Sequence, residues 1–446
     1  MDPVTLAPNV DLDLDLDLDQ DLDLGLGLGL ASFAGSFEEE RRTAVGSPEI
    51  ILAAGARTPF GDFGKSLRDV PLHTLGVHVV RACLRRAALD PAQVDHLVFG
   101  NTVPVDHDGH FLSRKVALVA GLPVESAALG VIRACGTGLQ AVVSAAQQIQ
   151  SDHSRIAVAA GGENYSRVPY LVHDLRWGGA TRGARSLVDG LDYIYRCPFS
   201  RELMGDTAEN LAERFGYRRE DMDAWGLMSQ QRAGAAQASG FLSRQIEALE
   251  VPAQAKGGGT QVFAHDEFPR PHLSAEKLAS LKPAFRTDGK GQVTAGNSSG
   301  VSDGAAALLV CRHDEAQKAS IRPEARLLDW AVVGVPPEIM GAGPVPAIRK
   351  LLERNALQVD AIDYFEINEA FAVVNLHAER ELGIPRERTN LYGGGISIGH
   401  PPGATGLRMT ITAMHHLADT KGRYAVISMC LGSGMGMAAL IENLLR

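Results

Sequence analysis

The sequence is poor in cysteine and contains no long apolar run. Five cysteines occur among 446 residues, and no two of them have the C-x-x-C spacing. A sparse, odd set is typical of a reducing compartment and argues against a disulfide framework or a zinc cluster, so we expect no metal site. No apolar stretch reaches the length that a membrane-spanning helix needs, and we therefore expect no membrane partner.

Basic charge is also scarce, especially near the start of the chain. The formal net charge is −10 at pH 7, which argues against a general binder of nucleic acids or anionic membranes. A secretory or mitochondrial signal needs basic residues, and none precedes Arg41. With no targeting signal visible, we expect a cytoplasmic protein without nucleic-acid partners.

The tract "DLDLDLDLDQDLDLGLGLGL" at residues 11–30 is acidic and then glycine-rich. Its strict alternation fits the period of a strand, but a single acidic strand has nothing to pair with. Low-complexity polar tracts of this kind are typical of disorder. We therefore predict a disordered tail over residues 1–47 and a folded part that begins near Pro48.

The chain contains an internal repeat with a shift of 268 residues. The segment "ALDPAQVDHLVFGN" begins at Ala88, and the similar segment "ALQVDAIDYFEINE" begins at Ala356. The same shift relates Val158 to Val426 and Cys135 to Gly403. One ungapped register across such separated segments predicts two related α/β halves.

In each half, helical segments alternate with short apolar strands. This order predicts an α/β fold with mostly parallel or mixed sheets that are covered by helices. The spacer at 167–290 is richer in charge and breaks the pattern, so we interpret it as an inserted loop domain. The N-terminal half then comprises residues 48–166 plus 291–316, and the C-terminal half comprises residues 317–446.

Four candidate catalytic residues lie where loops at the carboxyl ends of parallel strands are expected. Cys135 opens a helix in "RACGTGLQAV", and Asn368 follows the strand "DYFEI". His400 lies in "GISIGHPPGATG", and Cys430 ends the strand "YAVISMC". Because the dipole and free N–H groups of a helix amino terminus favour a thiolate, we expect a lowered pKa for Cys135.

Taken singly, each of these residues has an ordinary structural interpretation. Cys135 could be a core residue, part of a glycine loop for phosphate, or a nucleophile, and a His-Pro turn is commonly structural. Together the four residues favour acyl transfer. A thiolate nucleophile needs a base or a cation nearby, which a histidine usually supplies. A second cysteine can move a proton at carbon, and glycine turns offer N–H groups to an oxyanion.

Two other motifs are weaker. "GDFGKS", ending at Ser66, resembles part of a phosphate-binding loop, but Pro59 stands where that loop requires glycine. His107 and His110 lie in one loop and could suggest a metal, although a surface or subunit-interface loop is the favoured interpretation.

At these residues the sequence resembles the thiolase family, particularly the bacterial β-ketothiolases, from about Glu49 to Arg446. The blocks around His400 and Cys430 are the most specific. The family blocks occur in order, as "RTPFGDFGKSL", "CGTGLQA", "GGENYSRVPY", "MGDTAEN", "VTAGNSSGVSDGAAAL", "GPVPA", "NEAFA", "GHPPGATG" and "CLGSGMG".

The resemblance implies a role for each candidate residue. Cys135 would be acylated, and His400 would keep its sulfur reactive. Cys430 would move the proton at the α-carbon of the acetyl-CoA unit. Asn368, through a water, and His400 would form one oxyanion site, and the amides of Cys135 and Gly432 would form the other.

The resemblance also implies the substrates and the assembly. Acyl-CoA and CoA would be the substrates, no cofactor would be needed, and Ser299 would contact the pantetheine arm. Arg182 and Arg185 would either meet the CoA phosphates or lie in a solvated loop. The fold would be the duplicated thiolase α/β fold, layered α-β-α-β-α with a loop domain, in a homodimer or homotetramer that serves fatty acid metabolism.

One departure from the family concerns the acyl pocket. Acetoacetyl-CoA thiolases commonly have His-Met-Gly before "DTAEN", whereas this chain has Leu203, Met204 and Gly205. With Leu203 and Met204 lining the pocket, we expect a larger or branched acyl group.

Two rival functions are a ketoacyl or hydroxymethylglutaryl synthase, which would lack Cys430, and a catalytically silent acyl-CoA-binding paralogue, against which the four intact residues argue.

Overall fold

The computed structural model describes residues 48–173, 175, 186–254, 258–286 and 288–446. The predicted tail at 1–47 lies outside the described residues, as do Arg182 and Arg185. Within the described part of the chain, no helix is both long enough and apolar enough to cross a membrane.

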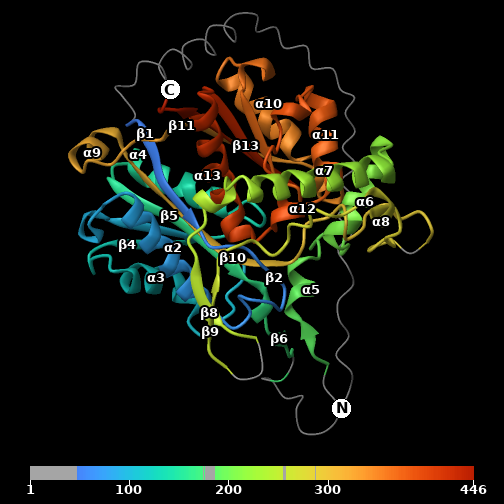
Figure 1. The fold of residues 1–446 in the computed structure, drawn as a ribbon, viewed down its shortest axis with the longest axis horizontal. Coiled ribbons are helices and arrows are strands. Elements are labelled where there is room, and N and C mark those ends of the chain that lie inside the picture. The colour runs from blue at the N-terminus through green and yellow to red at the C-terminus, as the bar shows by residue number, and fades with distance from the viewer. Residues whose placement is uncertain (1–47, 174, 176–185, 255–257, 287) are drawn as a thin grey trace, which may run out of the picture. The chain divides into compact units, whose positions relative to one another are not determined.

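A ten-stranded mixed sheet runs through the molecule in the order β12-β13-β14-β11-β1-β10-β5-β3-β4, with β2 beside β10 (Figure 1). Most of its strands are apolar and buried, which is typical of sheets with helices on both faces, whereas β11 is partly buried and the edge strand β4 is largely exposed. The strands are β1 (Ile50–Arg57), β2 (Gly61–Asp62), β3 (His96–Gly100), β4 (Ala127–Val131), β5 (Ile156–Asn164), β10 (Ser302–Arg312), β11 (Ala325–Gly334), β12 (Tyr364–Ile367), β13 (Tyr424–Leu431) and β14 (Met435–Asn443).

The strand register confirms the internal repeat. In the first half, β3 runs parallel to β5 with His96 opposite Ala157. In the second half, β12 runs parallel to β13 with Tyr364 opposite Ala425, and both partners lie 268 residues further along. The antiparallel pair of β1 and β11, in which Ile50 faces Leu327, joins the two halves into one sheet.

Side chains alternate along the strands, so that each strand faces inner helices on one side and outer helices on the other. This arrangement gives the five layers that the resemblance implies. Val98 and Ile427 point into a central apolar cluster that contains α4 (Thr137–Gln150) and α13 (Pro402–Thr420). Leu97 faces outward against α2 (Leu72–Arg86) and α3 (Leu112–Ala120). Val426 faces outward against α10 (Pro344–Arg354) and α11 (Ala372–Leu382). The α-β-α-β-α order is therefore confirmed.

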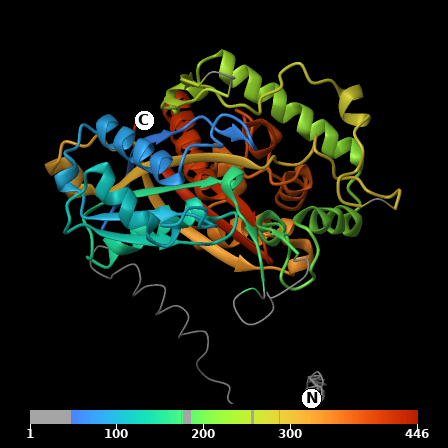
Figure 2. The same cartoon turned by 90° about the horizontal axis from the view of Figure 1, so that it is seen from below.

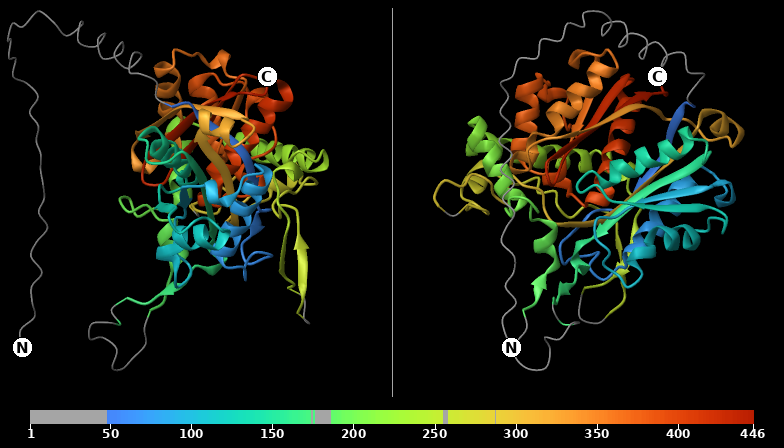
Figure 3. Two further views of the ribbon diagram at one scale, coloured as in Figure 1. Left: turned by 90° about the vertical axis from the view of Figure 1, so that its left-hand side faces the viewer. Right: turned by 180° about the vertical axis from the view of Figure 1, so that it is seen from behind.

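The segment between the halves adds two small strand pairs and several helices. The two longest helices of this segment are α6 and α7, and α7 packs against α11 and against α12 (Gly395–Ile398), which precedes His400. Figure 2 shows α7 and α8 side by side along one edge of the body, and Figure 3 shows β6–β7 and β8–β9 projecting from the body. The predicted domain boundaries stay a prediction. The added elements are β6 (Tyr170–Leu171), β7 (Val188–Asp189), α5 (Gly190–Ile194), α6 (Met204–Phe215), α7 (Arg219–Ala238), β8 (Leu249–Pro252), β9 (Thr260–Phe263) and α8 (Ala275–Ala279).

Candidate active site

The predicted residues gather at the carboxyl ends of the parallel strands in the two halves. Cys135 lies in the turn between β4 and α4, and Asn368 comes directly after β12. Cys430 is the next-to-last residue of β13, and His400 lies between α12 and α13. Each residue therefore lies at the end of a strand of the sheet or at the start of one of the two central helices, α4 and α13.

A sharp turn presents Cys135 at the start of α4. Ala134 has the left-handed φ of 43°, which is unfavourable for a residue with a Cβ. Thr137 holds the turn by accepting the N–H of Arg133 at 2.8 Å and donating its hydroxyl to the carbonyl of Ala134 at 2.7 Å. A Cβ on Gly136 would lie 2.3 Å from Cδ2 of Leu431, so the Leu431 side chain packs directly against this turn. The strained turn fixes the direction of the Cys135 side chain.

The electrostatics of Cys135 differ from the expectation. Burial of its sulfur raises the pKa of the thiol, and the N–H groups of Gly432 and of Cys135 itself oppose that rise. The predicted lowered pKa is therefore wrong in sign, because desolvation outweighs the N–H groups at the helix terminus. Cys135 rests as a thiol and needs a base to become a nucleophile.

His400 is buried, and hydrogen bonds hold both its backbone and its ring. Its backbone N–H donates to Oγ of Ser302 at 2.9 Å, and its ring Nδ1 lies 2.7 Å from Oγ1 of Thr405. The Thr405 hydroxyl donates its only hydrogen to the carbonyl of Pro401, so it must accept from Nδ1–H of His400. Burial and then the charge of Arg408 lower the pKa of His400 to about 3. His400 is thus a neutral imidazole whose Nε2 carries a lone pair.

Asn368 lies beside this imidazole. Its backbone N–H donates to the carbonyl of Ser428 at 2.9 Å, which ties it to β13 two residues before Cys430. Its Nδ2 lies 3.3 Å from Nε2 of His400. Its buried Oδ1 has no hydrogen-bond partner among the described residues. The Oδ1 atom can therefore accept a further hydrogen bond beside the imidazole of His400.

The two cysteines lie close enough to influence one another. Burial strongly raises the pKa of Cys430, and charge on Cys135 raises it further. Cys430 is completely buried in the cluster formed by α6, α7 and α11. It is therefore a thiol at neutral pH, and its proton is available to a strong base such as a carbanion.

The remaining predicted residues border this centre. The sulfur of Met204 lies 3.3 Å from where a Cβ of Gly432 would stand, so the first residue of α6 lies against Gly432. Leu203 immediately precedes α6 and donates its N–H to Asp206. Ser299 donates its N–H to the carbonyl of Ala370 at 2.9 Å, which places it beside the segment that follows Asn368.

Backbone contact between α4 and α13 brings the turn of Cys135 up to that of His400. A Cβ on Gly138 would stand 2.7 Å from the carbonyl oxygen of Gly403. A Cβ on Gly403 would stand 2.6 Å from the carbonyl of Gly100. Only glycines allow the starts of the two helices, which follow Cys135 and His400, to approach this closely.

Sequence reasoning missed the residues that support the site. Thr405 and Ser302, which hold His400, were not predicted. Neither was Glu163 at the end of β5, which accepts the N–H of Gly403 at 3.2 Å and both the N–H and the hydroxyl of Thr102. Burial raises the pKa of Glu163 to about 8. An acid at the end of an otherwise apolar strand is the signal that could have revealed it.

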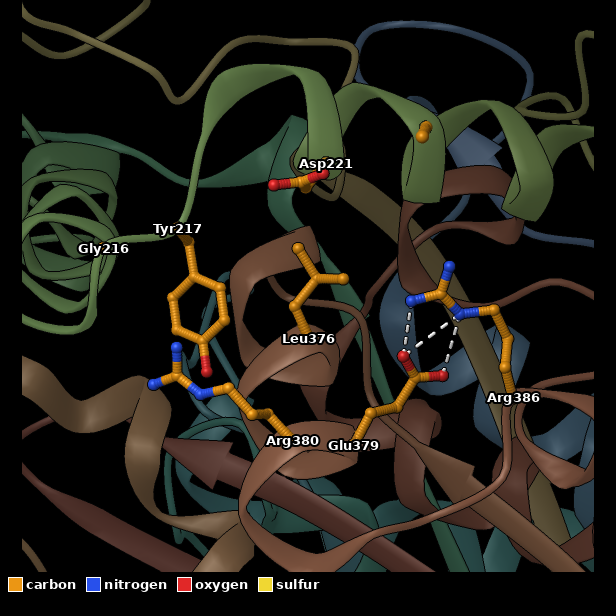
Figure 4. A pocket seen from close by; sticks show the side chains of 8 residues that line it. Gly216, Tyr217, Asp221, Leu376, Glu379, Arg380 and Arg386 are labelled. Carbon is orange, nitrogen blue, oxygen red and sulfur yellow. Dashed lines mark hydrogen bonds and ion pairs between the residues drawn. The ribbon is translucent and has the colours of Figure 1, made fainter.

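A hollow of about 500 Å³ lies apart from these residues, between the loop of Gly216 and Tyr217 and helix α11 (Figure 4). Arg386 and Glu379 form an ion pair in its wall. It contains none of the predicted site residues.

In the loop of His107 and His110, the neighbouring carboxylates are engaged by cations. Asp106 pairs with Arg167, and Asp108 pairs with Lys115. These ion pairs fit the surface-loop interpretation better than a metal site.

The chain matches two family models over most of its length. "Thiolase, N-terminal domain" matches residues 50–314, and "Thiolase, C-terminal domain" matches residues 321–443. The beta-ketothiolase BktB of Cupriavidus necator is 42% identical over 397 residues, which cover 89% of this chain and 99% of the relative. The cytosolic acetyl-CoA acetyltransferase of Mus musculus is 38% identical, with 89% and 99% covered.

Solved structures show the same likeness. Human mitochondrial 3-ketoacyl-CoA thiolase in complex with CoA has a TM-score of 0.85 and 37% identity, covering 89% of this chain and all of that chain, 100%. The acetyl-CoA acetyltransferase of Bacillus anthracis has a TM-score of 0.84 and 38% identity, covering 89% and 99%. The likeness therefore includes both halves and the segment between them.

Proposed function

Since the chain belongs to the thiolase family, we propose that it carries out the family's reaction through an acyl intermediate on Cys135. The protein is an acyltransferase, and the reaction is CoA-dependent thiolysis of a 3-oxoacyl-CoA and the reverse Claisen condensation of an acyl-CoA with acetyl-CoA. One observation carries the residue assignment. The Asn368–His400 contact lies at the same sheet edge as two cysteines whose charges influence each other.

In the first half of thiolysis, Nε2 of neutral His400 takes the proton of the Cys135 thiol as the sulfur attacks the keto carbon. The bond between the α-carbon and the keto carbon then breaks. The acyl group stays on Cys135, and the electron pair leaves with the acetyl-CoA unit as an enolate. Cys430 donates its proton to the α-carbon, and acetyl-CoA departs.

In the second half, the thiolate of Cys430 takes the proton of an incoming CoA thiol. The CoA sulfur attacks the thioester carbon, the bond to Cys135 breaks, and acyl-CoA is released. His400 returns its proton to Cys135, so both cysteines and the histidine regain their starting forms.

Two groups of donors would hold the oxygen atoms that become negative. The amides of Cys135 and Gly432 would face the oxygen of the carbon attached to Cys135. The N–H of Gly432 opposes the rise in the pKa of the Cys135 thiol, which supports this placement. Asn368 and protonated His400 would face the enolate oxygen of acetyl-CoA.

The acyl pocket would favour a chain larger than acetyl or a branched one, because Leu203 offers no polar group to a short acyl chain. Met204 would pack beside it, and Ser299 would contact the pantetheine arm of CoA. No cofactor would be required, since Cys135, His400 and Cys430 supply the nucleophile, the base and the acid. We place the reaction in the cytoplasm and in fatty acid metabolism.

We further propose a homodimer or homotetramer. Among the described strands, β4 pairs only with β3, and it leaves its other edge free beside the exposed side chains of Val124 and Ile132. The segment around β7 exposes Leu187 and Phe199 in a second place. Apolar edges of this kind are commonly covered in oligomers. Light scattering would test this, and Ile132→Lys would be expected to dissociate the subunits.

Purified protein assayed with 3-oxoacyl-CoA substrates of several chain lengths would test the activity itself. We expect loss of substrate only when CoA is present, and no turnover by Cys135→Ala. A lack of turnover at every chain length would favour the silent paralogue. Turnover that survives in Cys135→Ala would refute the assigned nucleophile.

A further inference from the structure

A buried ion pair joins β12 to α13. Arg408 donates from Nη1 to Oε1 of Glu366, and Tyr364 donates its hydroxyl to Oε2 of the same carboxylate. The side chains of Arg408 and Glu366 are 0% and 1% exposed. Tyr364 stacks on His416 of α13, and the carboxylate of Glu369 is the other charge that acts on Glu366. The charges are thus fully enclosed by the central layer.

The pair spans the two elements that deliver Asn368 and His400. Glu366 stands two residues before Asn368 on β12. Arg408 stands one turn of α13 beyond Thr405, the residue that holds Nδ1 of His400. A link between β12 and this turn of α13 therefore controls how the Asn368 amide meets the imidazole.

The internal repeat offers a comparison within the same chain. The positions that correspond to Glu366 and Arg408 in the first half are Val98 and Gln140, which carry no charge. Val98 is simply part of the central apolar cluster. The ion pair thus occurs only in the half that contains Asn368 and His400. Buried ion pairs contribute little net stability compared with apolar residues of the same volume, so stability alone is a weak reason for it.

We propose that Glu366 and Arg408 are positioning residues, which lock β12 to α13 and thereby set the Asn368 amide against Nε2 of His400. The inference rests on the proposed function, because Asn368 and His400 matter only if they serve the thiolase reaction. Neither Glu366 nor Arg408 touches the substrate in this account.

The test compares Glu366→Gln/Arg408→Met with the wild type in CoA-dependent thiolysis. The double variant removes both charges of the pair together, whereas each single variant leaves one of them without its partner, so we expect the melting temperature of the double variant to exceed that of either single variant. We expect its kcat to fall by about tenfold or more, because small misplacement of catalytic groups is costly, while KM stays within about twofold. A wild-type kcat in the double variant would overturn the proposal.

A matched control is the Arg57–Asp266 pair, whose side chains are 0% and 1% exposed. Arg57→Met/Asp266→Asn likewise removes both charges of a buried pair, yet it should keep kcat within about twofold of the wild type, since Arg57 and Asp266 lie outside β12 and α13. An equal loss of kcat in both double variants would show a general effect of damaged packing and would contradict a positioning role.

A mutant cycle with Asn368→Ala tests whether the ion pair acts on kcat through Asn368, even where a variant changes stability. If the ion pair acts through Asn368, removing it in the Asn368→Ala background should lower kcat by less than about twofold further. Independent, multiplicative losses would overturn the inference. An inactive wild type would refute the proposed function itself, which separates that failure from the failure of the positioning role.

Discussion

Thr405 holds the imidazole of His400, with Oγ1 lying 2.7 Å from Nδ1. The same hydroxyl donates to the carbonyl of Pro401 at 2.9 Å. A hydroxyl with one hydrogen cannot donate twice, so this arrangement fixes the proton of His400 on Nδ1 and leaves the lone pair on Nε2. The proposed activation of Cys135 requires this tautomer, which a single threonine determines.

Replacing Thr405 by Val should lower kcat by about 10- to 100-fold, because the imidazole loses the acceptor that selects its tautomer. Thr405→Ser keeps the hydroxyl and should stay within a few-fold of the wild type. Thr410→Val is a matched control, since Thr410 is also buried on α13 and donates to the carbonyl four residues earlier. Steady-state thiolysis kinetics would measure all three, and equal losses in Thr405→Val and Thr410→Val would contradict the tautomer argument.

The pKa directions predict how the reactivity of Cys135 depends on pH. The pKa of Cys135 is raised and that of His400 lies at about 3, so both groups are neutral at pH 7 and no thiolate–imidazolium pair forms. The rate of alkylation by iodoacetamide should therefore keep rising from about pH 6 to about pH 9, as the thiolate fraction grows. Cys135→Ala protein provides the blank. A rate that is level across this range would indicate a preformed ion pair.

Leu203→His tests the acyl pocket. A histidine would add a polar group where the chain has an aliphatic one, so we expect the preference to shift toward the four-carbon substrate by about tenfold in the ratio of kcat/KM values. Val262→His, an exposed change on β9, should leave the ratio unaltered. Strong activity of the unmodified protein on the four-carbon substrate alone would contradict the expected preference for larger groups.

Gly138→Ala tests the contact between the two helix starts. The added Cβ would meet the carbonyl oxygen of Gly403 at 2.7 Å, and we expect a loss of about 1–3 kcal/mol in the free energy of unfolding, as for other overpacked cores. Gly334→Ala has open space around it and should change stability by less than about 0.5 kcal/mol. Urea denaturation measures both, and equal stabilities of the two variants would refute the close approach.

The repeat is what made the fold predictable from the sequence. The shift of 268 residues predicted two equivalent halves, and the parallel pairs of His96 with Ala157 and of Tyr364 with Ala425 follow it residue for residue. The gathering of Cys135 and Asn368 at strand ends followed from the same periodic pattern. These features depend on the internal repeat and on the pattern of apolar residues, both of which can be seen in a single sequence.

Other features of the site depend on burial and on distant contacts, which the sequence does not record. The pKa of Cys135 was predicted in the wrong direction, because the sequence shows a helix start but not the desolvation around it. Ser302 lies 98 residues from His400 along the chain, yet it holds its backbone. Glu366 and Arg408 could have been noticed as charges at positions where the other half has Val98 and Gln140.

The central claim is that Cys135 carries the acyl group. The most direct measurement is mass spectrometry of the intact wild-type protein and its peptides after brief exposure to a 3-oxoacyl-CoA without added CoA, so that the second half of the reaction cannot proceed. We expect the peptide that contains Cys135 to gain the mass of one acyl group, which hydroxylamine removes, and Cys135→Ala to gain none. An acyl group found on another residue, or none while the wild type turns over, would contradict the account.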